Sequence, residues 1–216
     1  MPIILKKRIS QNIFIAVWQI TETEGFFFDS LRLIPEDEMR INSIKLQKVR
    51  LQKLACRAAL ANLLGTNEIA ITYTEKGQPQ LKNFHISFSH TEKAVAVALA
   101  KIPIGIDIEE LTPRILPLHP RFMNQREIGN CNINNLKELY YFWCAKEAMY
   151  KWFALKNLDF IEDLFVNKNE NIGIICNKYT VQLIDFCIKN LLIVVSFGGM
   201  TNYNKKTLYS PPDNYH

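Results

Sequence analysis

Residues 105–109 alternate between apolar and acidic side chains, in the order Gly-Ile-Asp-Ile-Glu. Successive side chains of a β-strand point to opposite faces, so this segment predicts a strand with Ile106 and Ile108 on one face and Asp107 and Glu109 on the other. At roughly 3.3 Å per residue, the two carboxylates lie about 7 Å apart and repel each other unless a cation lies between them. Mg²⁺ is usually held by one or two carboxylates together with substrate phosphates and water. The segment therefore predicts a half-buried strand with a metal-binding face, although an isolated acidic pair also suits a solvated sheet edge.

Residues 143–151 read Trp-Cys-Ala-Lys-Glu-Ala-Met-Tyr-Lys and predict a helix with 3.6 residues per turn. Glu147 and Lys151 then share one face, and Lys146 lies a quarter-turn away. Apolar side chains gather on the opposite face: Phe142, Ala145, Met149, Trp152 and Phe153. A carboxylate beside two ammonium groups suits a site that holds a cation and a multiply charged anion. The alternative for this helix alone is an exposed ion pair between Glu147 and Lys151, which contributes roughly 0.2–0.5 kcal/mol.

Four segments in order along the chain resemble the sequence pattern of the Sfp-type 4′-phosphopantetheinyl transferase superfamily. Residues 105–109 match its G-[IV]-D-[IVL]-E block, and residues 143–151 match its [FW]-x-x-K-E-[AS]-x-x-K block. Residues 86–91, Ile-Ser-Phe-Ser-His-Thr, resemble its S-H-S segment, with a threonine in place of the second serine. Residues 121–127, Arg-Phe-Met-Asn-Gln-Arg-Glu, resemble its R-F-F-x-x-x-E segment. The resemblance covers residues 73–151, and the first seventy residues match only in general character.

The resemblance implies transfer of the 4′-phosphopantetheine arm from coenzyme A to a serine of an acyl or peptidyl carrier protein, with release of 3′,5′-ADP. It implies Mg²⁺, with Mn²⁺ as a substitute, held by Asp107, Glu109 and Glu147. Glu147 is the expected acceptor of the serine proton, with Glu127 as an assistant. Lys151 is expected to stabilise or protonate the departing phosphate, and Lys146 to add positive charge beside it.

The resemblance also suggests which residues contact coenzyme A. They are Arg40, Lys48, Lys76, Gln78, Ser89, His90, Asp107, Lys146 and Lys151. The G-K-P turn of the family reads Lys76-Gly77-Gln78-Pro79 here, so a glutamine stands where the family has a lysine. His90 follows Ser89 at the expected end of a strand, and the resemblance assigns it to a phosphate of coenzyme A.

Charge and cysteine content limit the partners and the compartment. The chain has a net charge of +5, which favours an acidic partner. Its basic residues are not interleaved with aromatic ones as in nucleic-acid-binding proteins, so nucleic acid is not expected. The resemblance implies an acidic carrier protein instead, because members of that family modify such proteins. The five scattered cysteines show no metal-binding spacing and predict reduced thiols. We expect no membrane span, no signal peptide, a cytoplasmic location and, by analogy with the family, a monomer.

Hydrophobic patterning predicts an α+β fold. Strands are expected at 12–20, 69–73, 85–89, 94–100, 103–109, 172–176, 180–184 and 191–197, and helices at 35–38 onward, 44–64, 122–130 and 136–156. Each half thus has a long helix and a small antiparallel sheet. The family adds two similar α/β subdomains in a pseudo-twofold arrangement. We expect an N-terminal subdomain at 1–102, a C-terminal subdomain with the metal site at 103–200, and a mobile tail at 201–216.

Two other functional classes remain open at this point. A magnesium-dependent pyrophosphohydrolase with the same carboxylates would cleave coenzyme A or a nucleotide with water. A catalytically silent carrier-protein-binding module would not need Asp107, Glu109, Glu147 and Lys151 together. The sequence has no P-loop, no G-x-G-x-x-G and no H-E-x-x-H motif, so the commoner nucleotide and zinc enzymes gain no support.

Overall fold

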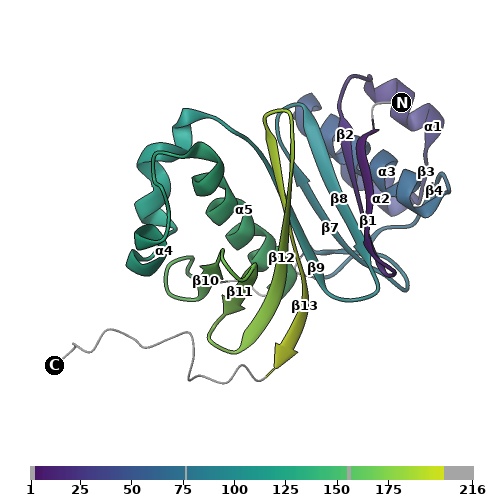
Figure 1. The fold of residues 1–216 in the computed structure, drawn as a ribbon. Helices are drawn as coiled ribbons and strands as arrows, with labels where there is room; N and C mark the ends of the chain where they lie inside the picture. The colour runs from purple at the N-terminus through teal and green to yellow at the C-terminus, as the bar shows by residue number, and fades with distance from the viewer. Residues whose placement is uncertain (1–2, 76, 155–156, 202–216) are drawn as a thin grey trace.

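The structure is a computed structural model that describes residues 3–75, 77–154 and 157–201. Within these ranges the fold is α+β, as predicted, with two antiparallel sheets between two groups of helices (Figure 1). Lys76, residues 155–156 and all of the predicted tail except Thr201 lie outside the described residues.

The N-terminal sheet has four strands in the order β1-β2-β8-β7. Their bounds are β1 Ile3–Ser10, β2 Ile13–Gln19, β7 His85–His90 and β8 Ala94–Ala100. All three pairings are antiparallel. The helices that accompany this sheet are α1 Glu24–Ser30, α2 Pro35–Asn42 and α3 Gln47–Leu64. Two small sheets connect them to β7, and their strands are β3 Arg32–Leu33, β4 Glu68–Ile69, β5 Thr72–Tyr73 and β6 Pro79–Gln80.

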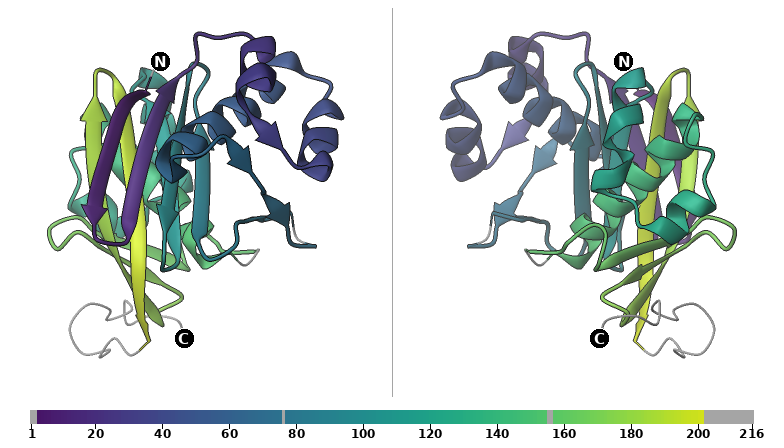
Figure 2. Two further views of the ribbon diagram at one scale, coloured as in Figure 1. Left: turned by 90° about the vertical axis from the view of Figure 1, so that its right-hand side faces the viewer. Right: turned by 90° about the vertical axis from the view of Figure 1, so that its left-hand side faces the viewer.

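The C-terminal sheet has five strands in the order β10-β11-β12-β13-β9. Their bounds are β9 Ile104–Glu110, β10 Leu164–Asn167, β11 Ile172–Ile175, β12 Tyr179–Ile188 and β13 Leu191–Thr201. Between β9 and β10 the chain forms the 3₁₀ helix η1 Pro113–Arg121, α4 Gln125–Gly129 and α5 Leu136–Phe153. The right-hand view of Figure 2 looks onto α4 and α5, which lie over the outer side of this sheet.

The two sheets pack face to face because their facing side chains are small or β-branched. In β8, Ala94, Ala96, Ala98 and Ala100 belong to the core between the sheets, whereas Val95, Val97 and Leu99 belong to the core under α3. In β13, Ile193 and Val195 face the intersheet core, whereas Leu192 and Val194 face α5. The layers are therefore α3, N-terminal sheet, C-terminal sheet and α5. The period-2 alternation assigns each side chain to its layer.

Several predicted boundaries are confirmed and others are wrong. The strands at 85–89 and 94–100 occur as predicted. The helix predicted at 44–64 ends at Leu64 as expected but begins at Gln47, and Gly65 has the left-handed φ of 71° that suits a C-cap. The single strand predicted at 69–73 is instead divided between β4 and β5, which pair with different partners. The helix predicted at 122–130 is confined to α4, because Asn124 forms a capping box with Glu127 and fixes its start.

Six elements were not predicted: β1, α1, β3, β6, η1 and β10. β1 is an edge strand in which half of the residues are exposed and none is fully buried. It includes Lys6, Lys7 and Arg8, so it lacks the apolar run that marks a buried strand. η1 contains two internal prolines, which are unfavourable inside a helix, so the sequence pattern indicated a loop there. Within the described residues, no helix is long and apolar enough to cross a membrane.

Candidate functional site

The acidic face of β9 is turned toward α5. Ile106 and Ile108 are buried between the sheets, as the alternation predicts, so Asp107 and Glu109 point the other way. Gly105 allows the close approach of these two elements, because a Cβ atom at this position would overlap the backbone carbonyl of Ala148 in α5. The glycine of the 105–109 segment is thus required by packing, and it brings the acidic residues of β9 next to Glu147 and Lys151.

Asp107 is the centre of this arrangement. Its Oδ1 atom accepts hydrogen bonds from Ser89 Oγ at 2.7 Å and from Lys151 Nζ at 2.7 Å. Lys151 Nζ also donates to the carbonyl of Ile106 at 3.0 Å. The other carboxylate oxygen, Asp107 Oδ2, is buried and has no hydrogen-bond partner. A buried carboxylate oxygen without a donor is costly, so this atom is a candidate ligand for a cation.

Glu109 and Glu147 flank Asp107, and the charges of the three groups interact. Partial burial raises the pKa of Glu147, and the negative charge of Asp107 raises it further, while Lys151 opposes the shift. Burial and Asp107 likewise raise the pKa of Glu109. Glu109 accepts hydrogen bonds from Trp143 Nε1 at 3.2 Å and from Arg114 Nη2 at 2.9 Å. These carboxylates therefore form one acidic cluster, defined here as Asp107, Glu109 and Glu147.

The acidic cluster has the chemistry of a metal site, but its side chains are not arranged as one. No three His, Cys, Asp or Glu side chains among residues 3–75, 77–154 and 157–201 are arranged to hold a metal ion. The oxygens of Glu109 accept hydrogen bonds from Trp143 and Arg114 instead. The chemistry of the donors nevertheless fits a hard divalent cation: all are carboxylate oxygens, one is buried without a partner, and two are destabilised by neighbouring negative charge.

The structure does not bring Lys146 and Glu127 to this cluster. Both side chains are fully buried, and Lys146 Nζ donates to Glu127 Oε2 at 2.7 Å. Lys146 also donates to the carbonyl of Phe160, and Glu127 accepts from the backbone of Asn124 and Val166. The charges of Lys146 and Glu127 are therefore compensated by each other and by hydrogen bonds within the C-terminal half. The sequence pattern placed Lys146 beside the site because helical winding alone does not reveal that α4 covers this side of α5.

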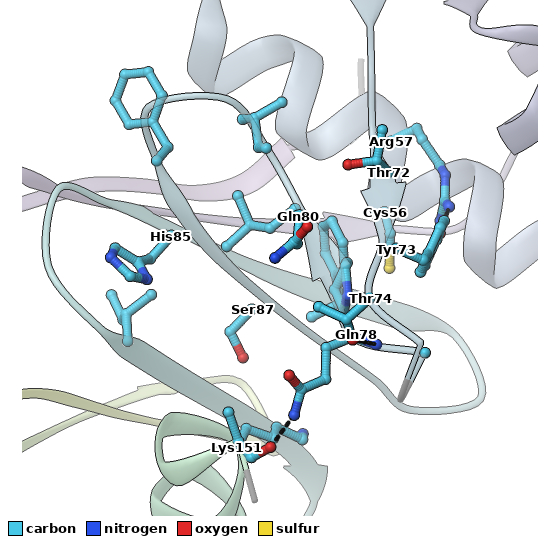
Figure 3. Close-up of a pocket in the computed structure, with 18 of the residues that line it drawn as sticks. Cys56, Arg57, Thr72, Tyr73, Thr74, Gln78, Gln80, His85, Ser87 and Lys151 are labelled. Carbon is cyan, nitrogen blue, oxygen red and sulfur yellow. Dashed lines mark hydrogen bonds between the residues drawn. The ribbon is translucent and has the colours of Figure 1, made fainter.

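A pocket of about 980 Å³ extends from Lys151 across the N-terminal half (Figure 3). Three of the residues predicted to bind coenzyme A line it, namely Arg40, Gln78 and Lys151. The side-chain amide of Gln78 donates a hydrogen bond to the carbonyl of Ala154, just beyond α5, and the dashed line in Figure 3 marks this bond between the two halves. Ser87 also lines the pocket, and its Oγ accepts from the backbone of Ile106 at 3.1 Å, which attaches β7 to β9.

Other predicted ligands lie beside the pocket or away from it. His90 is exposed at the end of β7, and its pKa is lowered by partial desolvation and by the nearby ammonium groups of Lys53 and Lys151. Ser89 is buried and donates its hydroxyl hydrogen bond to Asp107. Lys48 is exposed, pairs with Glu92 at 3.3 Å and is not among the residues that line the pocket. Lys76 lies outside the described residues.

Several pocket residues were not predicted. Lys53, Tyr73, Lys82, His85 and Tyr150 all line it. Lys53 lies one turn before Arg57 on α3, and helical spacing from the buried positions of α3 could have selected it over Lys48. Tyr150 lies on α5, and the others come from short strands and a turn, where no periodic pattern reveals which side chains converge.

Comparison with known proteins agrees with this geometry. Residues 103–190, which include β9 and α5, match the family model described as the 4′-phosphopantetheinyl transferase superfamily. This segment, less than half of the chain, is similar to the superfamily. The match begins immediately before β9 and ends before β13, so it contains the whole acidic cluster and Lys151.

Named relatives in the superfamily show the same relationship. The chain is 28% identical over 104 residues to a 4′-phosphopantetheinyl transferase of Bacillus subtilis, and the aligned segment covers 44% of this chain and 46% of the relative. It is 30% identical over 95 residues to 4′-phosphopantetheinyl transferase Sfp of Bacillus subtilis strain 168, covering 41% and 42% of the two chains. For 4′-phosphopantetheinyl transferase psf-1 of Bacillus pumilus, the identity is 36% over 76 residues, or 33% of each chain. The matched segments thus span less than half of these relatives.

Proposed function

We propose that the protein transfers the 4′-phosphopantetheine arm of coenzyme A to a serine hydroxyl of an acidic carrier protein. The observation that carries this proposal is the arrangement around Asp107. Its buried oxygen lacks a donor, two further carboxylates lie close to it, and Lys151 joins it to a large pocket lined by cationic side chains. Such a site suits a pyrophosphate that must bind near negative charge without being repelled.

Mg²⁺ is the cofactor that these donors fit, held by Asp107, Glu109 and Glu147 in this proposal, with Mn²⁺ as a substitute. When bound, the ion supplies positive charge that neutralises the pyrophosphate oxygens during transfer. Glu109 must then exchange its hydrogen bonds with Trp143 and Arg114 for the metal. Ser89 and Lys151 keep the other oxygen of Asp107 fixed, so that Asp107 Oδ2 stays available.

In the proposed reaction, the serine oxygen attacks the phosphorus that carries the pantetheine arm, and the bond from that phosphorus to the bridging pyrophosphate oxygen breaks. Glu147 accepts the serine proton, and its raised pKa makes it a stronger base than an ordinary glutamate. Lys151 stabilises the 3′,5′-ADP that leaves, because its ammonium group lies at the junction of Asp107 and the pocket. Lys146 and Glu127 have no direct part, since each neutralises the other in the interior.

The proposed partners follow from charge and family. The net charge of +5 favours a collision with an acidic carrier protein and raises its rate more than its affinity. The proposal also includes a monomer located in the cytoplasm, and a pseudo-twofold relation between the two halves, each of which has one sheet and one 18-residue helix.

The test is the intact mass of an apo acyl carrier protein after incubation with this protein, coenzyme A and Mg²⁺, with EDTA as the control. We expect a mass gain equal to one phosphopantetheine arm, and we expect EDTA to prevent it. Consumption of coenzyme A without a mass gain would favour a pyrophosphohydrolase. Intact coenzyme A with every member of a panel of carrier proteins would favour a silent binding module.

A further inference from the structure

A buried polar network lies under the wall of the pocket that Arg57 and Tyr73 line. Arg57 and Asp37 are 1% exposed and form a two-point ion pair, with Arg57 Nε at 2.9 Å and Arg57 Nη2 at 2.6 Å from the two carboxylate oxygens. The hydroxyl of Tyr73 donates to Asp37 Oδ1 at 3.1 Å and accepts a short hydrogen bond from Arg57. The phenol of Tyr73 is therefore fixed at its hydroxyl end by two buried, charged groups.

The ring of Tyr73 supports a cation on the pocket wall. The guanidinium carbon of Arg40 lies 4.0 Å from the centroid of this ring, a distance typical of a cation–π contact. Both residues line the pocket, and the Arg40 guanidinium also approaches the Gly77 turn. Among the described residues, Arg40 forms no ion pair with a carboxylate. Its charge is thus available to an anion in the pocket.

Arg40 and Lys53 differ in what they face. The ammonium group of Lys53 lowers the pKa of His90, so Lys53 faces the end of β7. Arg40 lies on Tyr73 of β5, on the side formed by α2 and the Gly77 turn. Some ligands carry a phosphomonoester in addition to a pyrophosphate. If the pyrophosphate binds at the acidic cluster, the phosphomonoester is available to bind Arg40. Coenzyme A has this chemistry, because its 3′-phosphate is separate from its pyrophosphate.

We propose that Tyr73 is a positioning residue that holds Arg40 for the 3′-phosphate of coenzyme A, and that the Asp37–Arg57 pair fixes Tyr73 in this role. The inference rests on the proposed function in its choice of ligand. It explains why a tyrosine hydroxyl is placed between two buried charges beside a binding pocket. A guanidinium restrained on an aromatic face loses less conformational freedom when it binds a phosphate than an unrestrained one.

The test is calorimetric binding of coenzyme A and of 3′-dephospho-coenzyme A, without any carrier protein, so it does not depend on transfer. Wild-type protein should bind coenzyme A more tightly than the dephosphorylated form, and R40Q should lose most of this preference. Y73L should reduce the preference by roughly 2- to 5-fold, as the loss of one cation–π contact predicts. Y73F keeps the ring and should stay closer to wild type than Y73L. The double variant R40Q/Y73L should show no less preference than R40Q alone, because both changes remove the same effect.

A matched control and thermal unfolding separate positioning from general damage. The control is Phe186→Leu, which removes the ring that lies 4.4 Å from Lys7 Nζ, a cation–π contact outside the pocket. It should leave the preference for coenzyme A over the dephosphorylated form unchanged. Equal weakening of both ligands by Y73L would mean a structural role only and would overturn the inference. So would a wild-type protein that binds both ligands equally or binds neither. A protein that transfers nothing but shows the Tyr73-dependent preference would refute the proposed function and leave this inference standing.

Discussion

At the scale of single residues, Glu147 carries the most specific prediction. Glu147→Gln removes the proposed proton acceptor and one negative charge while it keeps the size of the side chain. We expect turnover to fall by at least about 100-fold, which is typical when a general base is lost, and the loss of one proposed metal ligand acts in the same direction. Glu138→Gln on the same helix, outside the acidic cluster, is the control and should stay within about 2-fold of wild type. Near-normal turnover of Glu147→Gln would refute the assignment.

The raised pKa values of Glu109 and Glu147 predict a pH-dependent response to the metal. A carboxyl group whose pKa is higher in the folded state favours folding while it is protonated, and this contribution is lost as the pH rises through the raised value. In EDTA, Glu147→Gln should therefore gain stability relative to wild type between about pH 4 and about pH 8. Mg²⁺ should raise the wild-type melting temperature more at the higher pH, where the ligands are ionised. Thermal unfolding at both pH values measures this, and an identical response of the two proteins would contradict it.

At the scale of elements, the contact between β9 and α5 sets the site. Gly105→Ala places a methyl group against the backbone carbonyl of Ala148, so one of the two elements has to move. We expect a loss of about 1–3 kcal/mol in the free energy of unfolding by urea, as for other overpacked sites, and a loss of activity with it. Gly129→Ala at the end of α4 has open space and is the control, which should be neutral or slightly stabilising. Equal stability of the two variants would show that the close approach is not required.

The buried pair Lys146–Glu127 links α5 to α4. We therefore expect substitutions in this pair to lower the free energy of unfolding and not the affinity for coenzyme A. Lys146→Met leaves the Glu127 carboxylate buried without its cation, so we expect a loss of about 3–5 kcal/mol in the free energy of unfolding. Replacing both residues, as in Lys146→Met with Glu127→Leu, should recover part of this loss. Urea unfolding of the three proteins measures both effects. An unchanged stability with weaker coenzyme A binding would instead support the phosphate contact that the sequence suggested for Lys146.

At the scale of the whole molecule, the sequence predicts what depends on local pattern. The alternation at 105–109 and the apolar run of β8 identify two strands and their buried faces, and the apolar face of α5 is correct. The pattern does not reveal the non-local contacts. The edge strand β1 is hidden by its charges, and the burial of Lys146 depends on α4 and the carbonyl of Phe160. The pocket wall of Arg40, Tyr73 and Gln78 combines α2 with the segment from β5 to β6. The resemblance suggested Arg40 and Gln78, whereas the contribution of Tyr73 is identified by the structure.

The packing of the two sheets joins the pocket of the N-terminal half to the acidic cluster of the C-terminal half. We propose that this joint site transfers a phosphopantetheine arm to a protein. The most direct measurement is the amount of 3′,5′-ADP released, counted against the carrier protein modified in the same reaction with Mg²⁺. The account predicts one 3′,5′-ADP per modified carrier protein and none when the carrier protein is omitted. Release of 3′,5′-ADP without a carrier protein, at a rate that its addition does not change, would contradict the account.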